Sequence, residues 1–207
     1  MKLATLRHRG GTAPARRNDH TWTLIEGYAD LGALLARPNW RELAENADGA
    51  EVKAEEAELE TVVPSPGKVV CVGLNYASHI KEMGRDLPSH PTLFAKYAET
   101  LTGPFDPVTA VAEDPELDWE GELVAVIGAE AYRVSEEEAG TRIAGYTSAN
   151  DISMRGWQFR TKEWLQGKMW ARSTPVGPVM VSADEFDYRS STLRTRVNGE
   201  ICLLYTS

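Results

Sequence analysis

Cysteine is scarce in this sequence, with Cys71 and Cys202 the only two among 207 residues. They lie far apart and show no CxxC spacing, which argues against a disulfide framework and against a thiolate zinc site. No apolar run approaches the roughly 20 residues that a membrane-spanning helix needs. The basic N-terminal stretch, residues 1–17, lacks the apolar segment of a secretory signal. We therefore expect a cytoplasmic protein that does not bind a membrane.

Positive charge is also in the minority, with 22 Lys and Arg against 31 Asp and Glu and a net charge of −9. Binding to nucleic acid needs clustered basic residues, so this balance argues against nucleic acid as a partner. A small anionic substrate is still compatible, because a local cationic site can form in an acidic protein. The hydrophobic fraction of 42% is that of a soluble globular protein with a packed core.

The chain divides into two predicted domains. Residues 1–62 form a small N-terminal domain, and residues 63–207 form a larger one, separated by the Pro- and Gly-rich residues 62–67. Hydrophobic spacing in the first part predicts strands at 2–7 and 21–26 and helices at 29–36 and 40–47. The acidic stretch at 51–60 predicts a solvated face or linker.

The second part is rich in predicted strands. Continuous apolar runs at 68–74 and 123–127 predict strands buried on both faces. Weaker patterns predict strands at 143–148, 176–182 and 193–197. Ser135 and Glu138 have the spacing of a capping box that opens a short helix, and residues 155–166 predict the longest helix. The predicted fold class is α+β, mostly β.

Acidic residues at the start of the second apolar run are candidate metal ligands. If Glu120 and Glu122 lie on that strand, its period of two places both carboxylates on one face, about 7 Å apart. Oxygen ligands suit a hard ion such as Mg²⁺, Mn²⁺ or Ca²⁺. Asp151, where the next strand meets a helix, is a third candidate. The alternatives are a solvated strand edge for the two glutamates and a helix N-cap or turn residue for Asp151.

Two further groups carry possible chemistry. His79 and Glu82 lie three residues apart, so on a helical turn they could activate a water together, or form a surface ion pair instead. Gly84, Pro88 and Pro91 make this segment a candidate lid. In the segment 155–168, Gln158 and Lys168 could hold a substrate carboxylate or enolate. The alternative there is an amphipathic helix whose aromatic residues belong to the core.

Taken together, these motifs resemble the fumarylacetoacetate hydrolase family. The motifs are KVVCVGLNYASHIKEMG, PTLFAKY, DWEGELVAVIG, GYTSANDISMRGWQ, WLQGK and TPVGPVMV, in the family order between residues 64 and 181. The resemblance implies a mixed β-sandwich roll with a small leading domain of the bacterial type, usually a homodimer. It implies a divalent metal, most commonly Mg²⁺. The implied metal ligands are Glu120, Glu122 and Asp151, the implied water-activating pair is His79 and Glu82, and the implied substrate contacts are Gln158, Lys168, Arg155 and Lys96.

The activity that the resemblance implies is hydrolysis of a C–C bond in a small β-keto or β-diketo acid, through a metal-stabilised enolate, with Lys168 assisting. Alternatives are an oxaloacetate decarboxylase, an acylpyruvase, a 2-hydroxyhepta-2,4-diene-1,7-dioate-type isomerase of a degradation pathway, or a non-catalytic remnant. Family members continue well past the turn found here at residues 197–200, and residues 201–207 do not resemble that continuation. We therefore expect a catalytic domain that is incomplete at its C-terminus. Lys168-Met169-Trp170 also departs from the Lys-Ser/Thr-Phe of the family.

Overall fold

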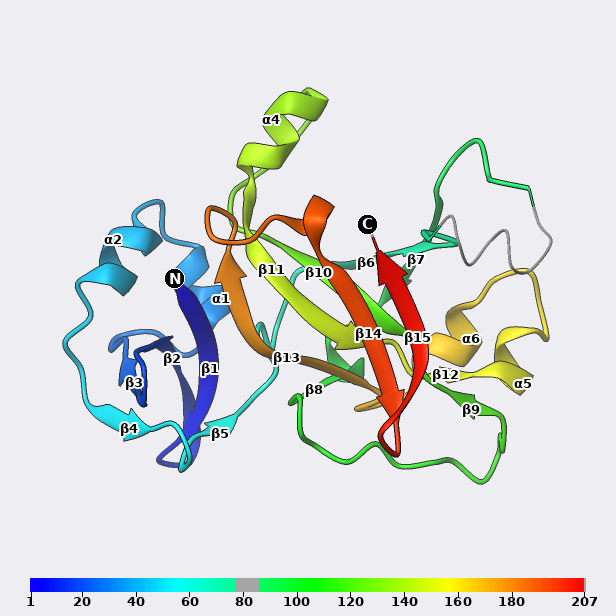
Figure 1. Ribbon diagram of the computed structural model, residues 1–207, viewed down its shortest axis with the longest axis horizontal. Coiled ribbons are helices and arrows are strands. Elements are labelled where there is room, and N and C mark those ends of the chain that lie inside the picture. Colours follow the sequence, from blue (N-terminus) through cyan, green and yellow to red (C-terminus); the bar gives the residue numbers. More distant parts are fainter. Residues whose placement is uncertain (77–85, 207) are drawn as a thin grey trace.

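The computed structural model describes residues 1–76 and 86–206, and strands dominate it (Figure 1). A large, mainly antiparallel sheet crosses the molecule in the order β10-β11-β13-β1-β2-β3-β4, with β5 paired to β1 and β8 paired in parallel to β13. Its strands are β1 (Lys2–His8), β2 (Gly11–Arg17), β3 (Thr21–Leu24), β4 (Glu51–Lys53), β5 (Glu58–Leu59), β8 (Leu101–Thr102), β10 (Gly121–Ile127), β11 (Ile143–Asn150) and β13 (Thr174–Ser182). The mostly β, α+β class predicted from the sequence is confirmed.

In the described part of the chain, three two-stranded sheets flank the large one. They are β6 (Val69–Gly73) with β7 (Thr92–Lys96), β9 (Leu117–Asp118) with β12 (Ser153–Met154), and β14 (Thr192–Val197) with β15 (Glu200–Thr206). The ribbon β14–β15 lies over β10 and β11 in Figure 1. Its turn uses Asn198 at φ 51° and Gly199 at φ 87°, the left-handed pair that a two-residue hairpin favours.

The helices are short. They are α1 (Leu31–Leu35), α2 (Trp40–Glu45), α4 (Glu136–Thr141), α5 (Arg155–Gln158) and α6 (Leu165–Lys168), with 3-10 turns at Ala98–Thr100 and Tyr188–Ser190. The predicted capping box is present at α4, where Ser135 and Glu138 exchange hydrogen bonds. No helix among the described residues is both long and apolar enough to cross a membrane.

The core lies on both faces of the sheet around β1. On one face, α1 and α2 pack against β1, β13 and β11 and bury a cluster led by Leu3, Leu31, Leu34 and Met180. On the other face, a smaller cluster forms around Leu6 and Trp22. The sheet therefore runs across the division proposed at residues 62–63, because β1 pairs directly with β13. The division into residues 1–62 and 63–207 remains a prediction.

Two predictions of strand burial were wrong. The runs at 68–74 and 123–127 are strands but are not buried on both faces, since Val70 is 60% exposed and Ile127 is 59% exposed. The reason is position: β6 belongs to a two-stranded ribbon, and β10 stands at the edge of the described sheet. The acidic stretch at 51–60 is a solvated face, one of its two predicted alternatives, since Glu51, Glu55, Glu56 and Glu58 are exposed; it is not a plain linker, because β4 and β5 pair there with β3 and β1.

The long helix predicted at 155–166 is broken into α5 and α6. Thr161 stands between them, where its hydroxyl donates to the Glu163 carbonyl and accepts from the Glu163 amide. Such local side-chain bonds compete with the helical hydrogen bonds and end a helix. The break lets α6 turn back against α5.

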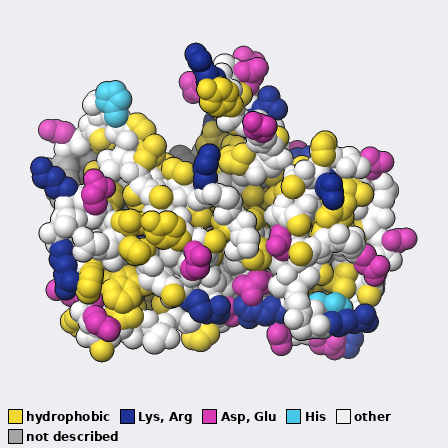
Figure 2. Space-filling view, turned by 180° about the vertical axis from the view of Figure 1, so that it is seen from behind, with side chains coloured by type: hydrophobic (Ala, Val, Ile, Leu, Met, Phe, Trp, Pro, Cys, Tyr) yellow, Lys and Arg dark blue, Asp and Glu magenta, His cyan; other side chains and the backbone are white. Residues whose placement is uncertain are grey.

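The surface mixes charge and apolar groups. On the face in Figure 2, basic and acidic side chains are interspersed, with hydrophobic side chains between them. Large hydrophobic residues exposed on the molecule include Val70, Leu93, Phe105, Tyr132 and Phe159.

Candidate active site

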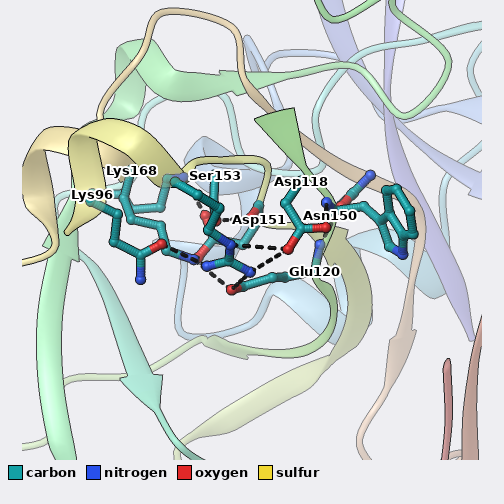
Figure 3. A network of polar contacts seen from close by, with 10 residues as sticks. Lys96, Asp118, Glu120, Asn150, Asp151, Ser153 and Lys168 are labelled. Atoms are coloured by element: carbon teal, nitrogen blue, oxygen red, sulfur yellow. Dashed lines mark hydrogen bonds and ion pairs between the residues drawn. The ribbon is translucent and has the colours of Figure 1, made fainter. Parts of the chain in front are cut away.

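The candidate site forms where β10 begins and β11 ends. Gly121 of β10 pairs with Asn150 of β11, so the residues on either side of this pair meet. The Asp151 amide donates to the Glu120 carbonyl at 2.8 Å, and the Glu120 amide donates to Asn150 Oδ1 at 3.0 Å. These bonds hold the carboxylates of Glu120 and Asp151 side by side at the end of the sheet (Figure 3).

Two buried lysines reach this pair from other elements. Lys168, at the end of α6, is 1% exposed, and its Nζ donates to Glu120 Oε2 at 2.5 Å and to Asp151 Oδ2 at 3.0 Å. Lys96, at the end of β7, is 4% exposed and donates to Asp151 Oδ1. Burial lowers the pKa of Lys96, while Asp151 opposes that shift. Because both lysines bind Asp151, its role is not that of a helix cap, and Met154 occupies the N-cap of α5.

Arg155 adds a third cation from the first position of α5. Its guanidinium contacts Asp118 Oδ2 at 2.7 Å and Glu120 Oε1 at 2.6 Å, and donates to Gln158 Oε1 at 2.6 Å. Gln158 is buried, so its amide is held in one place by this bond and by packing. The site thus presents a guanidinium and an amide beside two ammonium groups.

Glu122 lies in the same electrostatic environment. Burial, then the charges of Glu120 and Asp151, raise the pKa of Glu122 to about 7, and a hydrogen bond with Tyr76 partly opposes this shift. The neighbouring thiol of Cys71 responds in the same way, since burial and the charge of Asp151 raise its pKa to about 11. Burial and the neighbouring carboxylates therefore both disfavour the charged form of Glu122.

The family model for the C-terminal domain of fumarylacetoacetate (FAA) hydrolase matches residues 68–203, well over half of the sequence. The chain belongs to the fumarylacetoacetate hydrolase family. The match covers every element that contributes a described side chain to the site.

Curated relatives in this family carry oxaloacetate tautomerase names. The human protein "Oxaloacetate tautomerase FAHD2A, mitochondrial" is 41% identical over 142 residues, which are 67% of this chain and 45% of that protein. The Xenopus laevis protein of the same type is 39% identical over 142 residues, 67% of this chain and 44% of that protein. The chain thus spans less than half of the length of these relatives. Their names place them in mitochondria, and the cytoplasmic location expected here remains a prediction.

Solved structures support the family fold over nearly the whole chain. The fumarylacetoacetate hydrolase from Exiguobacterium antarcticum superposes with a TM-score of 0.85 at 29% identity, covering 99% of this chain and 74% of that one. A putative HpcE protein from Mycobacterium smegmatis gives a TM-score of 0.86 at 27% identity, covering 99% and 75%. The mixed β fold that the resemblance implied is confirmed.

The carboxylates of this family member fit a hard divalent ion in their chemistry. Three carboxyl groups supply only oxygen ligands, and Glu122, whose pKa is raised first by burial and then by the charges of Glu120 and Asp151, would gain from a nearby cation. Among the described residues, no three acidic, His or Cys side chains already surround one point that could hold a metal. The Lys168 Nζ lies between Glu120 and Asp151. A bound ion would compete with Lys168 for the same oxygen atoms.

Most of the residues predicted for the site meet in one place. Those with a described contact or electrostatic coupling in the cluster are Lys96, Glu120, Glu122, Asp151, Arg155, Gln158 and Lys168. Their individual roles remain predictions. His79 and Glu82, the predicted water-activating pair, lie outside the described residues.

Sequence reasoning missed two neighbours that shape the cluster. Asp118 binds Arg155 through two nitrogens, and Asn150 holds the Glu120 backbone. Both are adjacent to predicted ligands, so the signal was present in the motifs DWEGE and SAND. The motifs did not show the pairings themselves, because Asp118 meets Arg155 of α5 and Asn150 meets the Glu120 backbone at the start of the opposite strand.

Proposed function

We propose that this chain carries the site of an enzyme that forms or discharges an enolate on a small anionic β-dicarbonyl acid. The observation that carries the proposal is the buried pairing of Lys168 and Lys96 with Glu120 and Asp151 at the mouth of the sheet. Buried cations placed in advance stabilise negative charge that develops on an oxygen far better than water does. An enolate is such a charge.

Arg155 and Gln158 supply the binding side of this proposal. A guanidinium can donate two parallel hydrogen bonds to a carboxylate, and the Gln158 side chain fixes the orientation of Arg155. On substrate binding, Arg155 would exchange one of its present acidic partners for the substrate carboxylate. This supports a small dicarboxylate or keto acid as the substrate class.

Glu120, Glu122 and Asp151 would hold the divalent metal that the family resemblance implies, with Mg²⁺ as the first ion to test. When bound, such an ion supplies Lewis-acid polarisation of carbonyl oxygens. The Lys168 side chain would then lie next to the reacting oxygen, held in place by its burial. Proton transfer to and from carbon needs a general base, and His79 with Glu82 remains the prediction for it.

Keto–enol tautomerisation of oxaloacetate is the first reaction to test. It requires only formation of the enolate and its reprotonation, and proteins 39–41% identical over 142 residues carry that name. Hydrolysis of a C–C bond is the second candidate, favoured by the likeness to the Exiguobacterium antarcticum fumarylacetoacetate hydrolase. It passes through the same kind of enolate but also needs an activated water. We also propose that the protein forms a homodimer, as the family resemblance implies.

The test begins with thermal unfolding of the purified chain in EDTA and then in millimolar Mg²⁺ or Mn²⁺. An ion present at 100 times its dissociation constant adds about 2.7 kcal/mol to the free energy of unfolding. We expect a higher melting temperature with metal, and we expect Glu122→Gln to lose that shift. If the wild type and Glu122→Gln both unfold cooperatively and metal changes the melting temperature of neither, the ligand assignment would be contradicted. That result would favour a non-catalytic remnant.

A substrate panel then separates the reactions. Oxaloacetate is followed at its enol absorbance for tautomerisation and by pyruvate release for decarboxylation, and an acylpyruvate is followed by release of its two acids. We expect the enol of oxaloacetate to decay faster with enzyme than without it, and Glu122→Gln to abolish the difference. Turnover of the acylpyruvate alone would favour the hydrolase instead.

A further inference from the structure

Asp114 is a buried acidic residue that is not part of the candidate site described above. It lies in an acidic stretch with Glu113 and Glu116, both exposed, yet Asp114 itself is only 3% exposed. A buried carboxylate is costly unless hydrogen bonds satisfy it. Its two oxygens accept from the amides of Glu116 and Trp157, each at 2.9 Å. The second bond connects this loop to a residue 43 positions later in the chain.

That second bond caps α5 from outside. Met154, the N-cap residue of α5, has no side-chain capping bond, so the free amides of the first turn need another acceptor. Asp114 supplies it at Trp157, the third residue of the helix. The fit is close, because a Cβ added to Gly156 would lie 2.8 Å from Asp114 Oδ1 and 3.0 Å from Oδ2. Only glycine at that position lets the helix approach the carboxylate.

Further bonds fasten the same helix start to the same loop. The Arg155 amide donates to the Glu116 carbonyl at 2.9 Å, and Trp157 Nε1 donates to the Glu113 carbonyl at 3.4 Å. The short sheet β9–β12 continues the contact, pairing Leu117 with Met154 and Asp118 with Ser153. Within the loop residues 113–118, Asp114 alone has a buried side chain, and the helix that it holds carries Arg155 and Gln158.

We propose that Asp114 is a positioning residue for substrate binding. By capping α5, it sets the place from which Arg155 reaches the substrate carboxylate and Gln158 orients Arg155. It touches neither the substrate nor the reacting atoms. This inference rests on the proposed function for its kinetic consequence, but its structural part, the capping of α5, can be tested without activity.

The kinetic test compares Asp114→Ala with Asp114→Asn and with the control Glu113→Gln. Glu113→Gln removes a charge from the same loop at an exposed side chain, so its KM should match that of the wild type. Asp114→Ala should raise KM for oxaloacetate about tenfold or more with a smaller change in kcat, because binding geometry is lost first. Asp114→Asn keeps one acceptor oxygen, which can still accept from the Trp157 amide but leaves the Glu116 amide without its bond, so it should restore only part of the loss.

A double-mutant cycle with Arg155→Met shows whether Asp114 acts through Arg155. If it does, adding Asp114→Ala to Arg155→Met should raise KM little further, because the group being positioned is already absent. Fully additive increases in KM would overturn the proposal and leave Asp114 with a general role in stability.

Hydrogen exchange separates failure of this inference from failure of the proposed function. If the wild type turns over nothing in the panel, the proposed function has failed, while the cap is still decided by exchange of the amides at 155–158. Asp114→Ala should speed that exchange at least tenfold over the wild type and Glu113→Gln, with β11 and β13 unchanged. Unchanged exchange at 155–158 would overturn the cap. If Asp114→Ala does not fold, Gly156→Ala gives the same comparison, because its Cβ would lie 2.8 Å from Asp114 Oδ1 and push the carboxylate away from α5.

Discussion

At the scale of single residues, Lys168 is the group on which the charge balance of the site depends. Its buried Nζ contacts both Glu120 and Asp151. Lys168→Met keeps the length of the side chain but leaves these carboxylates without their shared cation. Removing one partner of a buried ion pair costs roughly 3–5 kcal/mol of stability. We expect a loss of that order in EDTA, measured by chemical denaturation, and a fall of at least about 100-fold in turnover.

Added Mg²⁺ should distinguish this loss from ordinary misfolding. A divalent ion can replace the missing charge, so we expect Mg²⁺ to stabilise Lys168→Met more than it stabilises the wild type. Lys162→Met, at an exposed lysine of the same segment, serves as the control and should behave as the wild type does in both conditions. A Mg²⁺ effect on Lys168→Met no larger than that on the wild type would contradict the idea that ion and ammonium compete for the same oxygens.

The residues of the site were largely predictable from the sequence, but the contacts between them were not. The period of two along a strand placed Glu120 and Glu122 together, and the strand end placed Asp151 nearby. What local pattern could not predict is the pairing of Asp151 with Lys96 and Lys168, because it depends on how β7 and α6 return to the sheet. Asp114 escaped notice for the same reason, since its burial is set by a helix 40 residues away.

At the scale of elements, the packing of α6 on α5 sets the distance between Lys168 and Gln158. Gly167 makes this possible, because a Cβ there would lie 2.6 Å from both Gln158 Cβ and the Met154 carbonyl oxygen. Gly167→Ala should push the helices apart and destabilise the fold by about 1–3 kcal/mol, the usual range for overpacking. Because Lys168 is the next residue, turnover should fall by more than the stability loss explains at 25 °C, where the variant remains folded.

Gly140→Ala in α4 is the matched control, since a Cβ added there meets no atom within 4 Å. It should leave turnover unchanged and stability equal or slightly higher. Chemical denaturation and steady-state kinetics on oxaloacetate measure both quantities. Equal turnover for Gly167→Ala and the wild type would show that the α5–α6 contact does not position the site.

Helices and strands were predicted well where a short sequence pattern defines them. They were predicted poorly where their burial or length depends on neighbouring elements. The capping box at Ser135 and the strands β10, β11, β13 and β14 followed from short patterns. The burial of β6 and β10 did not, because a hydrophobic run does not reveal whether a strand has neighbours on both sides. The break between α5 and α6 depended on one hydroxyl, at Thr161, competing with the helix backbone.

At the scale of the whole molecule, Asp106 joins the N-terminal segment to the rest of the chain. Its carboxylate accepts from Arg7 of β1 at 2.8 Å and 2.5 Å, from Thr102 at 2.7 Å, from the Gly103 amide at 3.0 Å and from Arg172 at 2.8 Å. The hydrogen bonds from Arg7, and then that from Thr102, hold the pKa of Asp106 well below its usual range, against the effect of burial. The ionised form is therefore favoured in the folded state.

This pKa predicts how stability depends on pH. A carboxyl group whose pKa is lowered by folding stabilises the fold above its unfolded pKa, about 4, and that stabilisation is lost as pH falls further. Asp106→Asn should cost about 2 kcal/mol at pH 7, as expected for hydrogen bonds to a charged group. The difference in free energy of unfolding between the wild type and Asp106→Asn should stay constant from pH 7 to 5 and shrink from pH 4 to 3.

Asp19→Asn, at an exposed carboxylate, serves as the control. In urea denaturation, its free energy of unfolding should equal that of the wild type across this pH range. If the difference in free energy of unfolding between the wild type and Asp106→Asn did not decrease in acid, the ionised Asp106 carboxylate would not be the group that connects β1 to the loop at 102–106.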